Sequence, residues 1–386
     1  MMRSARVGAP LFAGTLLAVC AGCGSPAPDD APAGVWGNTT AVEELAIGIE
    51  FGADEYMFGY IESIAVAADG TLYVSDQQQN LVRMYDAEGV FLRDIGRQGQ
   101  GPGEYGSAPA LGVLPDGTLV MRDGSSSRVS FFSRGGEYLD SFPAGPGRDF
   151  VVDHEGIVLR RGFEGRVDLV KYSRAGEELG RVELPPRDIA GAETFFLGFG
   201  EGDIYPFPVE TQSAWSPLGY LVTGRNDVYD IELRRPEGTL HLRREIARPP
   251  VNSEERAEWE AFREGLEEQV RASGRDVQFE PTPAVKPYFR RIHVGDDGRI
   301  WVFRYVAAEK RHDIEPLPDR PERPLLTWRE PWTYDVFEPD GTFLGSVVVP
   351  ETLRPHVFRD QRIWGALVDN NGVEQVVRLA VVPENR

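Results

Sequence analysis

Short apolar runs alternate with glycine-containing turns along most of the chain. VAADGTLYVSD (66–76) and LPDGTLVMRD (114–123) place apolar residues on both sides of an Asp-Gly pair, which is a strong signal for a β-hairpin. A second turn glycine follows the first by 19 or 20 residues, within segments such as MYDAEGVFLRDI that again read as strand, turn and strand. The glycine pairs are Gly70 and Gly89, Gly117 and Gly136, Gly156 and Gly176, and Gly219 and Gly238. Each repeat therefore predicts two hairpins and four strands.

This repeat predicts an all-β fold made of four-stranded antiparallel sheets. Tandem sheets of this kind, at a spacing of roughly 40–60 residues, are typical of a β-propeller. Blades are predicted at 61–95, 110–142, 148–184, around 216–246 and 290–349. The position four residues before the second glycine holds Tyr85, Phe132, Tyr172 and Phe337, whereas the fourth blade has Arg234 there. Strand alternation places these rings on one face, where we expect them to pack between neighbouring sheets.

The last predicted blade lacks a strand. After Pro350 the segments HVFRDQRIWGALVD and VEQVVRLAVV supply three strands, and AVEELAIGIE (41–50) is an orphan strand upstream of the first blade. Pairing these two ends of the chain would complete a sixth blade and remove the open edge that threatens any β domain. We therefore expect residues 41–386 to form a six-bladed β-propeller closed by its N- and C-terminal strands.

One segment departs from the strand pattern. NSEERAEWEAFREGLEEQVRASG predicts an amphipathic helix of about five turns, within an insertion at about 250–287. Asn252 can cap its N-terminus together with Glu255, and Gly274 can end it. Its apolar stripe consists of Trp259, Phe262, Leu266 and Val270. The stripe either packs against the rim of the propeller or forms a lid or docking surface.

Residues 1–22 differ in kind from the rest of the chain. Two arginines precede an apolar stretch that is too short to span a membrane comfortably and is typical of an export signal. The CAGC that follows resembles the lipobox of bacterial lipoproteins, in which Cys23 would be lipidated. Cys20 stands where such signals usually carry Leu, so ordinary secretion remains the alternative. Residues 23–40 predict a flexible tether. We expect an exported, cell-envelope lipoprotein held to a membrane through its lipid alone.

Charge and cysteine content exclude several classes of partner and chemistry. The formal net charge is −20, which argues against nucleic acid as a partner. Both cysteines lie in the leader, so the folded domain has no disulfide, no cysteine metal ligand and no thiol nucleophile.

The segment LVRMYDAEGVFLRDIGRQGQGPGEY (81–105) resembles NHL-type repeats, and specifically the bacterial six-bladed β-propeller lipoproteins. The best matches lie in the first two blades, at Asp69, Gly70, Asp76 and Gly89 and at Asp116, Gly117, Asp123 and Gly136. The resemblance covers most of residues 41–382. It implies a fold and an exported location, but no reaction, because a fold does not determine an activity.

The glycine cluster GRQGQGPGEYG (96–106) is the first candidate for chemistry. It lacks the Lys-Ser or Lys-Thr of a P-loop and no helix follows it, so we interpret it as a crossover between blades. Asp76 and Asp123 are interpreted as turn-capping residues.

The innermost strands supply the remaining candidates, which would face a central channel: Glu62, Arg148, Arg291, His293 and Arg359. The cations could bind an anionic ligand such as a carboxylate or phosphate, or they could pair with acidic neighbours and fill the funnel. The resemblance also suggests a zinc site, since some enzymes of this superfamily hold zinc in the channel through histidines. Only His293 of the five histidines falls on a predicted innermost strand, so no metal, cofactor or catalytic residue is predicted.

Our hypothesis is that the chain is a non-catalytic, membrane-anchored propeller that binds a protein, peptide or glycan on one rim. The alternative is a metal-dependent hydrolase or lyase with its site in the central channel.

Overall fold

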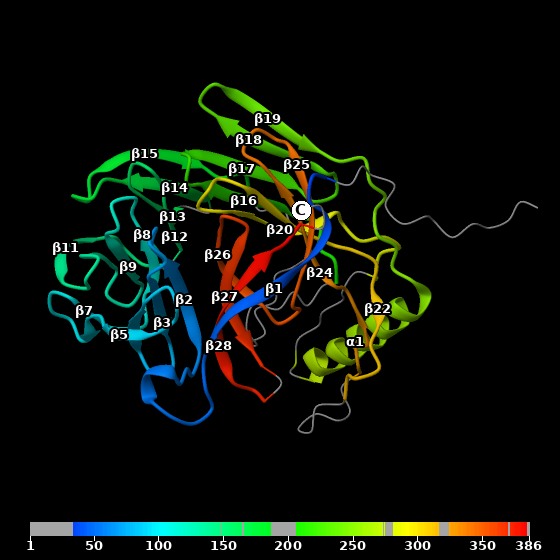
Figure 1. The fold of residues 1–386 in the computed structure, drawn as a ribbon. Coiled ribbons are helices and arrows are strands. Elements are labelled where there is room, and N and C mark those ends of the chain that lie inside the picture. Colours follow the sequence, from blue (N-terminus) through cyan, green and yellow to red (C-terminus); the bar gives the residue numbers. More distant parts are fainter. Residues whose placement is uncertain are drawn as a thin grey trace, which may run out of the picture.

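The sheets form a ring of blades (Figure 1). A computed structural model describes residues 34–147, 149–163, 166–186, 206–272, 274, 281–315, 324–369 and 371–383. Leaving aside two short two-stranded pairs, its strands form six four-stranded blades, of which the last two are joined into one eight-stranded sheet. The predicted all-β propeller is therefore confirmed.

The blades are numbered in chain order, and their strands are given from the innermost to the outermost. Blade one holds β2 (Ile61–Val66), β3 (Leu72–Asp76), β4 (Leu81–Tyr85) and β5 (Phe91–Asp94). Blade two holds β8 (Ala110–Val113), β9 (Leu119–Asp123), β10 (Arg128–Phe132) and β11 (Tyr138–Pro143). Blade three holds β12 (Phe150–Val152), β13 (Ile157–Phe163), β14 (Arg166–Tyr172) and β15 (Glu178–Glu183). Blade four holds β16 (Thr211–Ser216), β17 (Tyr220–Arg225), β18 (Asp230–Arg235) and β19 (Gly238–Arg243). Blade five holds β20 (Phe289–Val294), β21 (Ile300–Arg304), β24 (Trp332–Phe337) and β25 (Phe343–Val349). Blade six holds β26 (Arg354–Arg359), β27 (Arg362–Val368), β28 (Glu374–Val381) and β1 (Gly37–Ile47).

The repeated turns behave as the sequence predicts. Gly70 and Gly89 have φ of 89° and 84°, in the left-handed region that favours glycine. Asp69 accepts a hydrogen bond from the backbone N–H of Thr71 and so closes its turn. Three of the four predicted inter-blade rings are buried, namely Tyr85, Phe132 and Phe337, and Tyr172 is partly buried against the cluster between blades two and three.

Blade four starts earlier than its pattern suggested. Its innermost strand is Thr211–Ser216, whereas the apolar pattern placed the blade at about 216–246. The segment TQSAWS is mostly polar, so apolar residues flank the turn that follows it on one side only. Hydrophobic alternation therefore does not mark it.

The ring is closed by the first strand of the chain. Residues 41–47 of β1 pair antiparallel with β28, with Ala46 opposite Val377 and Ile47 opposite Val376. The preceding residues, from Gly37 to Thr40, pair parallel with β25, so the strand begins at Gly37 rather than at residue 41. The predicted closure is thus observed, and β1 also ties blade five to blade six.

Side chains of blade six bond to the backbone of blade one. Arg359 donates to the carbonyl oxygens of Val66 at 3.2 Å and Ala67 at 3.0 Å. Glu374 accepts a hydrogen bond of 2.9 Å from the N–H of Ile61. Apolar residues of both blades share one buried cluster. The first and last blades therefore contact each other as any other pair of neighbours does.

Loops between blades are fastened by buried carboxylates. Asp76 accepts hydrogen bonds from the N–H groups of Gly59 and Gln79, and Asp123 accepts them from Gly106 and Ser125. The glycine cluster at 96–106 is a crossover that contains the short parallel pair of β6 (Arg97–Gln98) and β7 (Glu104–Tyr105). Both interpretations made from the sequence are confirmed.

Two insertions interrupt the regular blades. Helix α1 (Ser253–Ala272) lies between β19 and β20, and β22 (Glu309–Lys310) and β23 (Trp328–Arg329) lie between β21 and β24. The predicted cap is present, because Asn252 Oδ1 accepts hydrogen bonds from the N–H groups of Glu254 and Glu255. The short 3₁₀ helix η1 (Asp54–Tyr56) precedes blade one. Among the described residues, no helix is long and apolar enough to cross a membrane.

The closure predicts a specific cross-link. Val42 lies opposite Ala380 in the β1–β28 pair. In a chain whose Cys20 and Cys23 are replaced by Ser, the double variant V42C/A380C should form a disulfide. By constraining the unfolded chain, this bond should raise the free energy of unfolding by about 2–4 kcal/mol in urea titrations, and reductant should abolish the gain.

A variant with the same number of cysteines but partners on distant blades, V42C/L139C, is the control and should not cross-link. Efficient cross-linking of the control, or none in V42C/A380C, would contradict the observed pairing.

Candidate functional site

Both insertions lie on the same rim of the propeller. Each blade has four antiparallel strands, so the chain enters and leaves a blade at one rim, and the turn between the second and third strands also lies there. Helix α1 precedes an innermost strand, and the β22–β23 segment joins a second strand to a third. Figure 1 accordingly shows α1 beside β22, outside the ring of blades.

A pocket of about 500 Å³ lies where these insertions meet blades four to six. We call it the rim pocket. Its volume falls within the range of about 300–1,000 Å³ that is usual for sites of small ligands. Its lining is dominated by aromatic and charged side chains, among them Phe207, Trp259, Arg290, Tyr305, Trp328 and Trp332.

Aromatic contacts shape the wall of the rim pocket. The ring of Phe207 meets those of Trp259 at 5.8 Å and Tyr305 at 5.5 Å, both edge to face. Phe207 has φ of 64° between two prolines, a backbone conformation that is costly for a non-glycine residue. Because its ring contacts both Trp259 and Tyr305, Phe207 brings together the segment before β16, the helix and the end of β21.

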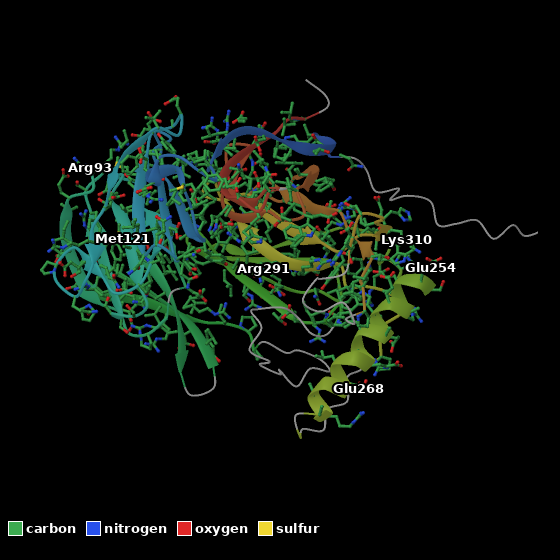
Figure 2. All side chains as sticks on the ribbon, turned by 90° about the horizontal axis from the view of Figure 1, so that it is seen from below. Arg93, Met121, Glu254, Glu268, Arg291 and Lys310 are labelled. Carbon is green, nitrogen blue, oxygen red and sulfur yellow. The ribbon has the colours of Figure 1, made fainter. Side chains whose placement is uncertain are left out.

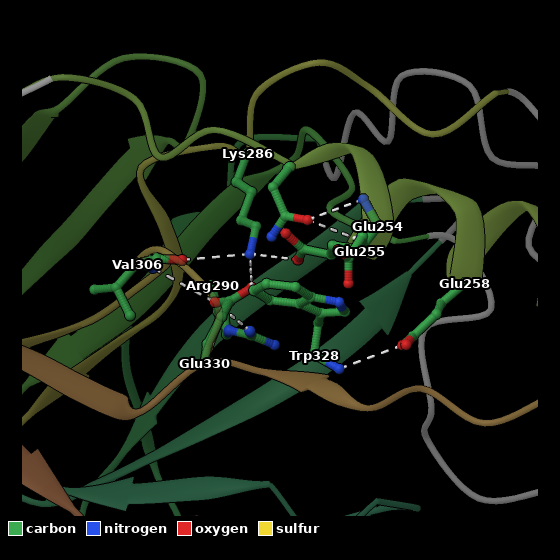
Figure 3. Close-up of polar contacts among 9 residues, drawn as sticks. Glu254, Glu255, Glu258, Lys286, Arg290, Val306, Trp328 and Glu330 are labelled. Atoms are coloured by element: carbon green, nitrogen blue, oxygen red, sulfur yellow. Dashed lines mark hydrogen bonds and ion pairs between the residues drawn. The ribbon is translucent and has the colours of Figure 1, made fainter. Parts of the chain in front are cut away.

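A buried ionic network lies behind this wall (Figure 3). Lys286 is fully buried, and its Nζ lies 2.6 Å from Glu255 Oε1 and 2.7 Å from Glu330 Oε1. It also donates to the carbonyl oxygen of Val306 at 3.3 Å. Arg290 donates to the second oxygen of Glu330 at 2.6 Å. The network joins the helix, the segment before β20 and the segment before β24.

Burial dominates the electrostatics of Glu255. Desolvation raises the pKa of this carboxyl above its ordinary value, even though the hydrogen bond and charge of Lys286 favour the ionised form. Its second oxygen, Oε2, is buried and makes no hydrogen bond of normal geometry with the described residues, although the backbone N–H of Asn252 lies near the carboxylate and favours its ionised form. The indole N–H of Trp328, another residue of the lining, is also buried and without a hydrogen-bond partner among the described residues. Such atoms are uncommon in folded proteins, and the described residues hold others away from the pocket, among them the indole nitrogens of Trp301 and Trp364.

Further contacts hold the helix against the β22–β23 pair. Glu258 accepts hydrogen bonds from the N–H groups of Thr327 at 2.5 Å and Trp328 at 3.3 Å. Lys310 pairs with Glu254 at 2.7 Å. The helix is thus fastened at its first two turns, and it forms one side of the pocket as well as packing on the rim.

The pocket also contains an arginine without an ion pair. Arg290 lies over the ring of Tyr305 at 4.3 Å and bonds to Glu330, and Arg311 pairs with Glu351 at 2.9 Å. Arg329, at the end of β23, is exposed and makes no ion pair with any residue that the structure describes. It is a cationic group available to a ligand.

The channel candidates from the sequence that the structure describes do not line the rim pocket. Arg291 is exposed near the centre of the ring in Figure 2, and Glu62 is half-buried on β2. Arg359 is engaged with the carbonyl groups of blade one, as described above. Arg148 and the lipidation candidate Cys23 lie outside the described residues.

His293 packs between blades instead of opening onto a ligand site. Its ring lies 5.3 Å from Phe358 and 5.9 Å from Tyr334. Burial, with a smaller effect of Arg291, lowers the pKa of His293 to about 3, so the imidazole is neutral at physiological pH. Across the described residues, no three His, Cys, Asp or Glu side chains lie close enough together to hold a metal ion.

Of the residues that line the rim pocket, only Glu255 and Trp259, both on the helix, were singled out by the sequence. A usable signal was present, since Trp259, Trp328 and Trp332 all lie in or beside the two insertions. The residues of the buried ionic network gave no such signal in the sequence, because Glu255, Lys286 and Glu330 are far apart in the chain.

An acidic group at the opposite rim has an unusual environment. Asp296, in the turn after β20, pairs with Arg359 at 3.6 Å and has Asp297 and Asp360 nearby. Burial first, and then the two neighbouring carboxylates, raise the pKa of Asp296 from 3.8 to about 6 against the opposing effect of Arg359. Its side chain nevertheless remains 50% exposed.

Removing the cation of the buried network should be strongly destabilising. K286M strands the buried carboxylate of Glu255 and leaves Glu330 paired with Arg290 alone, and the loss should be about 3–5 kcal/mol in the free energy of unfolding. Adding E255Q and E330Q to K286M should restore part of this loss, because neutral amides cost less to bury. Urea unfolding measures both. K310M, which removes an exposed ion pair, is the control and should leave stability nearly unchanged. A triple variant no more stable than K286M would show that stranded charge does not cause the loss of stability.

The raised pKa of Asp296 predicts a pH-dependent stability. A carboxyl whose pKa is higher in the folded than in the unfolded state favours folding while protonated, and this contribution is lost as pH rises from about 4 to beyond 6. D296N should therefore match the wild type at pH 3.5 and exceed it by about 1 kcal/mol at pH 8, a value discounted for the exposure of the side chain. The matched control is D54N, which removes an exposed acidic side chain at another site. A difference for D296N that is flat with pH would disprove this assignment.

Comparison with known proteins agrees with the architecture. Residues 52–109 match a family model described as a 6-bladed beta-propeller. Similar solved structures include a Bacteroides vulgatus protein of the DUF4221 family, with a TM-score of 0.47 and 11% identity over 89% of this chain and 98% of that one. A Bacteroides fragilis protein described as exported has a TM-score of 0.47 and 8% identity over 89% of this chain and 99% of that one. A virginiamycin B lyase from Staphylococcus aureus has a TM-score of 0.38 and 12% identity over 86% of this chain and 87% of that one. No curated protein matches in sequence. The family model and the observed sheets together show that the chain is a six-bladed β-propeller, the fold that the resemblance in the sequence implied.

Proposed function

We propose that this protein is an exported, non-catalytic binding module, anchored to a membrane through Cys23, which holds its ligand in the rim pocket. The observation that carries the proposal is the pocket itself, a concave site of about 500 Å³ lined by aromatic rings and a few charged groups. The candidate ligands are a glycan, a peptide or a segment of a protein.

The construction of the pocket supports binding by a preformed site. Lys286 is paired with two carboxylates and bonded to a carbonyl group, so the wall behind the aromatic rings is fixed before any ligand arrives. A site that is already ordered loses little conformational freedom on binding. The rim position also leaves the pocket accessible on a tethered domain.

A metal-dependent hydrolase or lyase in the channel is the second candidate function. It is supported only by the resemblance to a superfamily that contains such enzymes. Elemental analysis of the purified protein separates the two proposals, since stoichiometric zinc or calcium would favour the enzyme.

Blocking the rim pocket should abolish binding. Thr352 is exposed and lines the pocket, so T352W should fill it without disturbing the buried network. Soluble fragments of a peptidoglycan digest and a tryptic digest of envelope proteins serve as probes, with bound species detected by native mass spectrometry. The wild type should retain ligands that T352W does not.

The matched control is T342W, the same change at an exposed threonine in the β24–β25 turn on the opposite rim. It should bind as the wild type does. If T352W retains as much ligand as T342W, a ligand site in the rim pocket is refuted. The same holds if T352W, T342W and the wild type all retain no ligand.

A further inference from the structure

The rim pocket has an unusual balance of surfaces. Three of its side chains are tryptophans, at 259, 328 and 332, whereas Ile314 is the one branched aliphatic side chain among the lining residues that the structure describes. A lipid or an aliphatic peptide side chain would be matched by leucine, isoleucine or valine. Flat aromatic faces bordered by polar groups instead suit a ligand with flat C–H faces and a polar perimeter. A sugar ring has this form.

Two buried polar atoms of the lining favour a ligand with hydroxyl groups. Glu255 Oε2 is an acceptor and Trp328 Nε1 is a donor, and neither makes a hydrogen bond of normal geometry with the described residues. A hydroxyl group both donates and accepts, so neighbouring hydroxyls of one ring can serve the two atoms. Satisfying them would remove the cost of leaving polar groups buried and unpaired.

The charges of the pocket add a preference for a negative group. Glu330 is paired with Lys286 and Arg290, and Glu351 is paired with Arg311. Arg329 is exposed and, within the described ranges, has no ion pair. The planar guanidinium group of an arginine matches a carboxylate in a two-point contact.

We infer that the rim pocket binds a saccharide that carries a carboxylate, with the carboxylate at Arg329 and ring hydroxyls toward Glu255 and Trp328. This inference rests on the proposed function and narrows it to one ligand class. It also gives the ligand an orientation, because Glu255 lies on α1 whereas Arg329 and Trp328 lie on β23.

Calorimetric titration of the full domain with paired sugars tests the inference. The acidic probes are glucuronate, galacturonate and N-acetylmuramate, and their neutral counterparts are glucose, galactose and N-acetylglucosamine. At least one acidic sugar should bind at least about tenfold more tightly than its counterpart, as expected for one charge-assisted contact. This advantage should shrink as salt is added.

Arginine variants locate the contact. R329Q should remove the advantage of the acidic sugar and leave the weaker binding of the neutral one unchanged. R291Q is the matched control, because Arg291 is an exposed arginine of the channel and does not line the pocket. It should bind both sugars as the wild type does.

Two failures can be told apart. If the wild type binds peptide fragments, T352W does not, and no acidic sugar binds, the ligand class is wrong and the proposed function stands. If acidic and neutral sugars bind equally, or if R291Q weakens binding as much as R329Q, the assignment of Arg329 is wrong. If neither sugars nor peptides bind in a manner sensitive to T352W, both proposals fail.

Discussion

The pairing of β1 with β28 is the constraint on which the rest of the structure depends. Three C-terminal strands alone would leave β28 as an open edge, and an open edge in a propeller also leaves the ring unfixed. Because β1 contacts both β25 and β28, it joins blades five and six and completes the last sheet. Arg359 and Glu374 then bond blade six to blade one, so the ring closes at a defined size.

The rim pocket is a consequence of that closure. Its residues come from blades four, five and six and from two insertions, which only a closed ring holds at fixed separations. Within this frame, the Lys286 network performs a local task. It links α1 to the segments before β20 and β24 through paired charges that are costly to separate once buried. Global closure and local ion pairing thus act together on one site.

The fold was more predictable from the sequence than the site, for physical reasons. Turns such as the one at Gly70 need a left-handed backbone, so glycine marks them, and the cap at Asn252 is a contact between near neighbours in the chain. The Lys286 network has no such local signature, since its partners meet only after the ring has formed. The same holds for Arg359, whose partners are carbonyl groups about 290 residues away. Blade four shows the limit within the fold, because its polar innermost strand carries no hydrophobic period.

Hydrogen–deuterium exchange on the full domain and on a chain lacking residues 34–47 tests the central role of β1 most directly. If closure sets the stability of the ring, removal of β1 should reduce the protection of amides in β26, β27 and β28 together with those of β2 in blade one. Protection lost only along the exposed edge of β28, with β2 and β26 unchanged, would contradict this account.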